Sequence, residues 1–467
     1  MKKTRPPIVV VLGHVDHGKT TLLDAIRKTN IAGREAGGIT QGIGASKVVT
    51  EAGQLTFIDT PGHAAFSRMR LCGAKVADIA LLVVASDDGV KPQTIEALNY
   101  ILEVKIPYIV VLTKTDLPSA NVEKAKKELE ERGVLFEGRG GDVPVMEVSV
   151  KRNQGVEDLV EMIHLFSQFI EIKGDGGGEL KGYVIETRKD KKGMVVLVVV
   201  TDGKLGVGDE LNAAGIRAKV RGIFGEGGVG LKELGPGDAG LVMGFSEFPQ
   251  AGAGIEKATA GKVSDGGVKV RERAGVQKGE VVGDRLAIVV KASSSGSLEA
   301  VISCIPEGVV VISSGVGDVA ESDIFVAKSA EAMVFAFESA AQTSVLKLAE
   351  SERVRVERFE VIYDLVKRLE ELVEGKREKV SGKAEVIKKF PFDGKSVAGC
   401  RVIEGKIKMG GELVLRRGGK EMGKVKIVSL KRERQNIESA LAGEECGILF
   451  KPQLDFEEGD VLVSVAS

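Results

Sequence analysis

The chain has 467 residues, of which 43% are hydrophobic, so it can bury the cores of several domains rather than one. Its formal net charge of -1 provides no global field that would draw it onto a nucleic acid or a membrane, so any such contact must come from a local patch. The four cysteines form no C-x-x-C pair, so neither a zinc site nor a disulfide framework is indicated. No apolar run approaches the ~20 residues of a membrane span and no signal peptide is recognisable, so we expect a soluble, cytoplasmic protein.

Residues 1–172 alternate apolar runs with helical patterns. The alternation predicts an α/β fold in which helices wrap a parallel sheet. The expected strands are Ile8–Leu12, Leu55–Ile58, Ile79–Ala85, Tyr108–Leu112 and Val145–Val148. Functional loops of such sheets follow the carboxyl ends of the strands, and the candidate motifs of this chain fall there.

The first motif, Gly13–Thr20, fits the phosphate-binding pattern G-x-x-x-x-G-K-[ST] between an expected strand and an expected helix. Its backbone N–H groups and the helix N-terminus can close around phosphate oxygens. Lys19 would reach the β- and γ-phosphates, and the Thr20 hydroxyl would bind Mg²⁺. The alternative, a glycine-rich turn without a ligand, is disfavoured because the strand, loop and helix that the motif requires are all expected here in that order. We assign to the phosphate site Gly13, His14, Val15, Asp16, His17, Gly18, Lys19 and Thr20.

The second motif, Asp59–His63, ends the expected strand Leu55–Ile58. Its carboxylate can hold Mg²⁺ through water, the Gly62 N–H can meet the γ-phosphate, and His63 is placed to orient an attacking water as the catalytic residue. The alternative is an ordinary Pro-Gly turn. The residues assigned here are Asp59, Thr60, Pro61, Gly62 and His63.

The glycine-rich stretch Gly37–Gly44 lies between these two motifs and is poor in helix formers. We expect it to be mobile without a ligand. Thr40 is the candidate second Mg²⁺ ligand beside Thr20 and Asp59, so the stretch would act as a switch that γ-phosphate and Mg²⁺ order.

The third motif, Thr113–Asp116, follows the expected strand Tyr108–Leu112. The Asp116 carboxylate can accept hydrogen bonds from N1–H and the exocyclic amine of guanine, a donor pair that adenine lacks. The turn after the last strand could close over the base with backbone groups. The predicted base-binding residues are Thr113, Lys114, Thr115, Asp116, Ser149, Val150 and Lys151.

Three of the four histidines (His14, His17 and His63) lie in these loops, which could suggest a metal site. We discount a metal there, because no cysteine or third histidine is near in sequence and the H-x-x-H spacing serves the phosphate loop. The fourth histidine, His164, is expected on a helix surface.

The rest of the chain divides into a linker, two barrels and a second α/β region. Lys173–Gly178 predicts a flexible linker, and residues 180–262 predict a small β-barrel from short β runs split by Gly-Asp turns. Residues 283–359 predict an α/β/α domain. Residues 380–467 repeat the pattern of the first barrel, so we expect a second barrel of the same kind. Residues 360–376 predict a connecting helix with one apolar face, either packed on its own domain or serving as a spacer.

Basic residues crowd one hairpin region of the second barrel: Arg416, Arg417, Lys420, Lys424, Lys426, Lys431, Arg432 and Arg434. Such a local patch can contact a phosphate backbone, although a solvated hairpin is the simpler explanation of a charge run. Cys400 and Cys446 lie in small-residue stretches that we expect to be turns with accessible backbone amides. Such a pocket would favour a neutral, formylated amino group over an ammonium, since burying an unpaired cation is costly. The alternative, compatible with this one, is that both cysteines are buried packing residues.

Taken together, the motifs resemble those of bacterial translation initiation factor 2, a family of translational GTPases, nearly from end to end. The stretches that carry the resemblance are Gly13–Thr20, Glu35–Gln41, Asp59–His63, Gly296–Ala300, Gly315–Asp318, Ala398–Cys400, Ser429–Arg432 and Glu445–Gly447.

This resemblance implies a GTPase that uses GTP, GDP and Mg²⁺. It implies placement of formylmethionyl initiator tRNA on the small ribosomal subunit, subunit joining, and GTP hydrolysis stimulated by the large subunit. It further implies contact with other initiation factors and a monomeric protein without a membrane anchor. The residues that match the family's tRNA-binding region are Cys400, Lys431, Arg432, Glu445, Cys446 and Gly447.

Three departures from the family pattern matter. Thr113 stands where the family usually has Asn, which predicts weaker guanine binding, and Val150 stands where Ala is common. The family's N-terminal extension is expected to be absent, which bears on anchoring to the small subunit. A ribosome-assembly or tRNA-carrying factor remains the alternative, and a binding switch that does not hydrolyse GTP is the third class.

Overall fold

The computed structural model describes residues 3–29, 39–190, 193–258, 285–376, 380–392, 395–418, 420–433 and 435–465. Gly37 and Gly38 of the expected switch, Arg434 and the ends of four expected domains lie outside these ranges. The chain folds as two compact units, Met1–Leu369 and Glu370–Ser467. Within the described ranges, no helix is long and apolar enough to cross a membrane.

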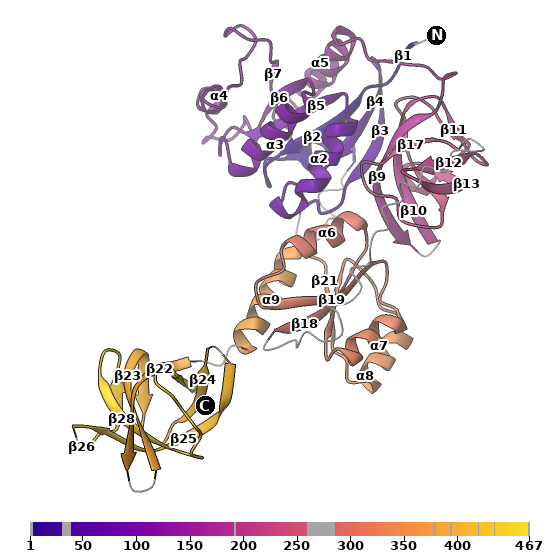
Figure 1. Ribbon diagram of the computed structural model, residues 1–467. Helices are drawn as coiled ribbons and strands as arrows, with labels where there is room; N and C mark the ends of the chain where they lie inside the picture. The colour runs from indigo at the N-terminus through magenta and orange to yellow at the C-terminus, as the bar shows by residue number, and fades with distance from the viewer. Residues whose placement is uncertain are drawn as a thin grey trace. The chain divides into compact units, whose positions relative to one another are not determined.

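The first domain (residues 3–172) is built on a six-stranded sheet in the order β3-β4-β2-β5-β6-β7 (Figure 1). The strands of this domain are β1 Lys3–Thr4, which lies outside the sheet, and the six sheet strands β2 Ile8–Gly13, β3 Gly44–Thr50, β4 Gly53–Asp59, β5 Ile79–Ala85, β6 Tyr108–Thr113 and β7 Val145–Glu147. Its helices are α1 Lys19–Arg27, α2 Ser67–Val76, α3 Pro92–Val104, α4 Val122–Glu130 and α5 Val156–Phe169, with a 3₁₀ turn at Ala64–Phe66. The expected α/β architecture is thereby confirmed.

One edge of this sheet departs from the expected parallel arrangement. Strand β3 runs antiparallel to β4, because a tight turn between Thr50 and Gly53 joins the two strands as a hairpin. The remaining neighbours in the sheet are parallel. Strand β2 is buried along its whole length, which explains its unbroken apolar sequence.

Helices α1 and α5 cover one face of the sheet, where their apolar residues join those of the strands in one core. The prediction for His164 is wrong. It lies on α5, but it is buried, and its Nε2 is 3.0 Å from the Thr50 hydroxyl of the β3–β4 hairpin. The helix turns this residue toward a hairpin that the sequence pattern did not reveal.

The prediction that Lys173–Gly178 is a flexible linker is also wrong. Lys173–Gly174 forms strand β8, which pairs with β1 at the beginning of the chain. The Asp175 N–H then donates to the Asp202 carboxylate at 2.9 Å. The segment is therefore fixed to both the first domain and the barrel that follows.

The first barrel (residues 180–258) closes with six strands in the order β12-β17-β9-β10-β16-β13, because β13 pairs back with β12. Its strands are β9 Lys181–Asp190, β10 Gly193–Asp202, β11 Leu205–Gly206, β12 Glu210–Ala213, β13 Ile216–Phe224, β14 Gly230–Leu231, β15 Glu233–Leu234, β16 Ala239–Phe245 and β17 Gly254–Lys257. A 3₁₀ turn spans Glu226–Gly228. Its core is aliphatic, as the composition required.

The third domain (residues 285–361) has a parallel sheet in the order β19-β18-β20-β21 with helices against it (Figure 1). Its elements are β18 Leu286–Ala292, α6 Ser295–Ser303, β19 Val309–Val316, α7 Glu321–Ser329, β20 Met333–Phe337, α8 Thr343–Ser351 and β21 Val356–Phe359. Helix α9, Ile362–Lys376, follows. Ile362, Leu365 and Leu369 are fully buried, so the first two turns of α9 pack within the first compact unit.

The last barrel (residues 380–465) also closes with six strands, in the order β22-β29-β24-β25-β28-β23, because β23 pairs back with β22. Its strands are β22 Val380–Phe392, β23 Lys395–Lys408, β24 Glu412–Arg417, β25 Lys420–Arg432, β26 Gln435–Asn436, β27 Ser439–Leu441, β28 Glu445–Lys451 and β29 Val461–Val465. The expected pair of similar barrels is thereby confirmed.

Candidate functional site

The loops with the three predicted motifs meet at one edge of the first domain's sheet. Strands β2, β4, β5, β6 and β7 run parallel, so their carboxyl ends lie together. Val11 pairs with Asp59, Gly13 with Val83, and Ala85 with Thr113. Segments more than 100 residues apart therefore lie at the same edge, which is where open α/β sheets bind their ligands.

The phosphate loop leaves β2 at a position that only glycine can occupy. Gly13 has φ +149°, and a Cβ there would lie 2.3 Å from the Val83 carbonyl oxygen. The loop closes at Gly18, the N-cap of α1, and points the helix N-terminus at the site. The Lys19 ammonium donates to the His14 carbonyl at 2.6 Å, so the loop holds this cation inside its own curve.

Three residues near this loop were predicted to supply oxygen ligands to Mg²⁺. The hydroxyls of Thr20 and Thr40 are 2.6 Å apart, although the residues come from α1 and from the switch stretch. Asp59 is buried at the end of β4, and its Oδ1 has no hydrogen-bond partner within the described part of the chain. A pair of hydroxyls and a buried carboxylate oxygen without a partner are the kinds of oxygen ligand that a hard divalent cation takes.

Burial also perturbs the titration of this carboxyl. Desolvation raises the pKa of Asp59 to about 6, against the opposing charges of Arg27 and Lys19. The carboxyl group is thus mainly ionised at neutral pH, and it becomes protonated as the pH falls below 6.

The second motif packs directly onto the phosphate loop. A Cβ on Gly62 would lie 2.5 Å from the Lys19 ammonium and 3.0 Å from the Val15 nitrogen, so the peptide approaches closely because the side chain is absent. The Thr60 hydroxyl donates to the Val11 carbonyl at 2.8 Å and fixes the start of the turn. Pro61 is buried beside it.

His63 has three neighbours that fix its ring. Its Nδ1 accepts from the Ala65 N–H at 3.2 Å, and its ring makes edge-to-face contacts with Phe66 and with Tyr363 of α9. Burial and then the charge of Arg70 lower the pKa of His63 from its ordinary value, so the imidazole is neutral at pH 7.

Arg70 is a functional candidate that the sequence did not reveal. It is fully buried on α2, its guanidinium donates to the carbonyls of Pro61, Gly62 and His63, and it pairs with Glu96 at 2.7 Å. It therefore holds the backbone of the second motif. Nothing in its local pattern distinguished it from a surface arginine.

The base-binding loops meet through two side chains. The Ser149 hydroxyl donates to the Asp116 carboxylate at 2.7 Å and, as the main cause, lowers the pKa of that carboxyl. The Arg152 guanidinium donates to the Asp116 carbonyl at 3.3 Å. Lys114 has φ +56°, the left-handed conformation that places the loop between β6 and α4. Val150 and Lys151 follow Ser149 in the neighbouring turn.

Thr113, which stands where the family usually has Asn, makes a hydrogen bond that the sequence analysis did not predict. It is buried, and its hydroxyl donates to the His17 carbonyl at 2.7 Å. The residue thereby joins the start of the base-binding loop to the phosphate loop.

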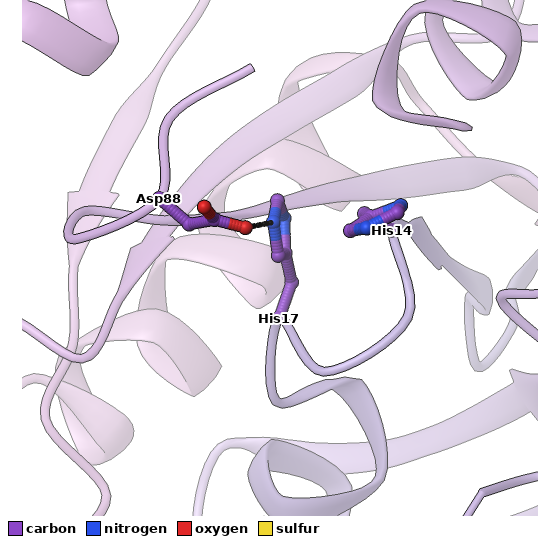
Figure 2. A group of neighbouring side chains, drawn as sticks. All are labelled: His14, His17 and Asp88. Atoms are coloured by element: carbon purple, nitrogen blue, oxygen red, sulfur yellow. Dashed lines mark ion pairs between the residues drawn. The ribbon is translucent and has the colours of Figure 1, made fainter. Parts of the chain in front are cut away.

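His14 and His17 lie beside Asp88, which follows β5 (Figure 2). Their ligand atoms lie within 4.8 Å of one another, and the His17 Nε2 is 3.5 Å from Asp88 Oδ2. Burial lowers the pKa of His17 to about 4, so this imidazole is neutral and its contact with Asp88 is longer than a hydrogen bond. Asp88 had not been predicted as a residue of the site. Its position after a parallel strand was the feature of the sequence that could have indicated it.

The predicted tRNA-binding residues come together on neighbouring strands of the last barrel. Strands β25, β28 and β23 are adjacent, with Lys431 opposite Gly447 and Cys400 opposite Cys446. Arg432 forms an ion pair with Glu444, and Glu445 pairs with Arg401 at 2.7 Å.

The expectation of turns at the two cysteines is wrong, and the alternative of buried packing residues is confirmed. Cys400 and Cys446 lie within strands, and their side chains are 1% and 5% exposed in the barrel core. Burial raises the pKa of Cys446 to about 11 and that of Cys400 further. Both side chains therefore pack the core of the barrel and do not line an accessible pocket.

Comparison with known proteins agrees with this arrangement. Residues 4–168 match the elongation factor Tu GTP binding domain, 179–258 the elongation factor G domain 2, 267–370 the translation-initiation factor 2 family, and 396–463 the elongation factor Tu domain 2.

Over 98% of its length, the chain is 40% identical to translation initiation factor IF-2 of Aquifex aeolicus and spans 60% of that relative. It is 39% identical to the IF-2 of Thermus thermophilus over 98% of its length and spans 86% of that relative. The crystal structure of GDP-bound aIF5B from Aeropyrum pernix is similar over 99% of this chain and 92% of that one, with 28% identity and a TM-score of 0.47.

Proposed function

Because the chain belongs to the translation initiation factor IF-2 family of translational GTPases, we propose that it carries formylmethionyl initiator tRNA to the small ribosomal subunit. It then promotes joining of the large subunit and hydrolyses GTP there, in the cytoplasm and in contact with other initiation factors. The observation that carries this proposal is the contact between the Thr20 and Thr40 hydroxyls at the phosphate loop, together with the buried Asp59 Oδ1 at the end of the neighbouring strand β4.

In this proposal the nucleotide site works through residues of three loops. Lys19 and the loop amides bind the β- and γ-phosphates, while Asp116 selects guanine with its carboxylate. Mg²⁺, when bound by Thr20, Thr40 and Asp59, supplies charge neutralisation on the phosphate oxygens. Because Thr40 comes from the switch stretch and Gly62 contacts Lys19, loss of the γ-phosphate releases both segments.

His63 orients the water that attacks the γ-phosphate. Its neutral imidazole can accept a proton or hold a water by a hydrogen bond, which is most of what a side chain contributes to a loose phosphoryl-transfer transition state. The buried Arg70 keeps the backbone of residues 61–63 in place for this task.

Substitution of His63 tests this role. We expect His63→Ala to bind GTP with unchanged affinity but to lose ~10²–10⁴-fold in ribosome-stimulated, single-turnover hydrolysis, because an orienting group is removed and the phosphate ligands remain. Nucleotide affinity measured on the same preparation is the control. Hydrolysis at the rate of the unsubstituted protein would reject His63 as the catalytic residue.

A further inference from the structure

The first turn of α9 is held by the switch stretch of the first domain. Gln41 is buried, and its side-chain amide donates to the Glu360 carbonyl at 2.6 Å. Its Oε1 accepts from the Ile362 N–H at 3.1 Å, so Gln41 satisfies a helix-terminal donor more than 300 residues away in sequence.

This anchored turn places one exposed aromatic side chain against His63. The rings of Tyr363 and His63 have centroids 4.5 Å apart with planes at 79°, an edge-to-face pair. Tyr363 is 49% exposed, whereas its helix is anchored by the fully buried Ile362, Leu365 and Leu369. The helix therefore does not need the Tyr363 ring for its own packing.

Another contact of His63 engages one of its two ring nitrogens. Its Nδ1 caps the 3₁₀ turn Ala64–Phe66 through the Ala65 N–H, and that nitrogen cannot at the same time hold a water through its lone pair. Of the three neighbours that fix the ring, Tyr363 is the one that belongs to another domain. An open cavity of 710 Å³ lined by Gln41, Glu338 and Glu360 lies next to the anchored turn.

We propose that Tyr363 is a positioning residue that holds the His63 imidazole in a resting orientation, so that GTP hydrolysis requires the first turn of α9 to withdraw from it. The proposal rests on the catalytic role proposed for His63. It gives helix α9, which follows the third domain, a direct restraint on hydrolysis in the free protein.

The test compares Tyr363→Ala and Tyr363→Phe in the full chain with GTP and no ribosomes. We expect Tyr363→Ala to raise single-turnover hydrolysis by roughly two- to tenfold, the range that one aromatic pair contributes. Tyr363→Phe should hydrolyse GTP as the unsubstituted protein does, because it keeps the ring. Lys367→Ala, exposed on the same helix, is the matched control and should have no effect.

Two further measurements separate this restraint from a general loosening of the fold. In His63→Ala/Tyr363→Ala the rise should be absent, because the released imidazole is missing. The pKa of His63, followed by NMR, should move up toward its ordinary value in Tyr363→Ala, because the ring loses part of its burial.

An unchanged or lower rate in Tyr363→Ala, with the His63 titration moved as expected, would overturn the restraint. If Tyr363→Ala changes neither the hydrolysis rate nor the pKa of His63, the ring contact between Tyr363 and His63 itself would be overturned. If His63→Ala hydrolyses GTP normally on ribosomes, the proposed catalytic role fails instead, and the His63 titration in Tyr363→Ala still reports whether the ring contact exists.

Discussion

At the scale of single residues, Thr113 and Asp116 divide the work at the base-binding loop. Thr113 is buried and ties the loop to the His17 carbonyl, whereas Asp116 is half-buried and its carboxylate is held by the Ser149 hydroxyl. Recognition of the base in our proposal therefore depends on Asp116, and the loop geometry depends on Thr113.

We expect Asp116→Asn to weaken GTP binding by roughly 10- to 100-fold, because a charged acceptor for N1–H and the exocyclic amine becomes partly a donor. Xanthosine triphosphate presents the opposite pattern and should bind more tightly to the variant than to the unsubstituted protein. Equilibrium titration with both nucleotides measures this. Asp158→Asn, an exposed carboxylate on α5, is the control. Retained GTP affinity without a gain for xanthosine triphosphate would contradict the assignment.

At the scale of elements, successive side chains along the strands of the last barrel face alternately the core and the outer surface. Side chains of Cys400 and Cys446 point inward, while Lys431 is exposed on the wall formed by β25 and β28. A nucleic acid would therefore meet the outer face of these strands. The neutral overall charge makes this local basic face the candidate for phosphate contact.

We expect Lys431→Ala and Arg432→Ala in the full chain to weaken binding of formylated and unformylated initiator tRNA alike. Each lost phosphate contact should flatten the slope of log affinity against log salt by about 0.9 or less. Titrations at several salt concentrations measure the slope. Lys204→Ala, an exposed lysine of the first barrel, should leave it unchanged. A slope that stays the same in both variants would exclude this face.

At the scale of the whole first unit, three domains meet at one buried junction. A Cβ on Gly296 of α6 would lie 2.0 Å from Met69 of α2 and 3.1 Å from the Glu186 carboxylate of β9. The Ser294 hydroxyl, at the N-cap of α6, donates to Glu186 at 2.7 Å. The Cys72 thiol of α2 approaches the backbone carbonyls of Val184 and Ile185 on β9 at 3.8 Å. The junction therefore buries an acidic group between domains.

Burial raises the pKa of Glu186 to about 7, against the opposing effect of the Ser294 hydrogen bond. The folded state holds this proton more tightly than the unfolded chain, so its contribution to stability is complete below pH 4.5 and is lost as the pH rises through 7. We expect Glu186→Gln, which keeps an acceptor for Ser294, to have a melting temperature roughly 2–5 °C higher than the unsubstituted protein at pH 8 and similar at pH 5.

Calorimetry at both pH values measures this difference. Glu247→Gln, an exposed acid on the first barrel, is the control and should follow the unsubstituted protein. A constant difference between Glu186→Gln and the unsubstituted protein at pH 5 and pH 8 would show that Glu186 does not titrate in this range.

The sequence by itself determined the classes of fold and the nucleotide loops. Phosphate and guanine require particular residue types at short, fixed spacings, so Gly13–Thr20, Asp59–His63 and Thr113–Asp116 could be identified without a structure. Apolar alternation likewise predicted both barrels and both α/β sheets, because the period of the pattern follows directly from the local backbone geometry.

Only the tertiary structure decided which distant groups meet. Burial of Arg70, the bond from Thr113 to His17, and the inward direction of Cys400 depend on which element packs beside each residue. The contacts of Gln41 and Tyr363 join segments about 300 residues apart. No local spacing encodes such pairs, because a side chain's partner is set by how whole elements pack and not by its neighbours in sequence.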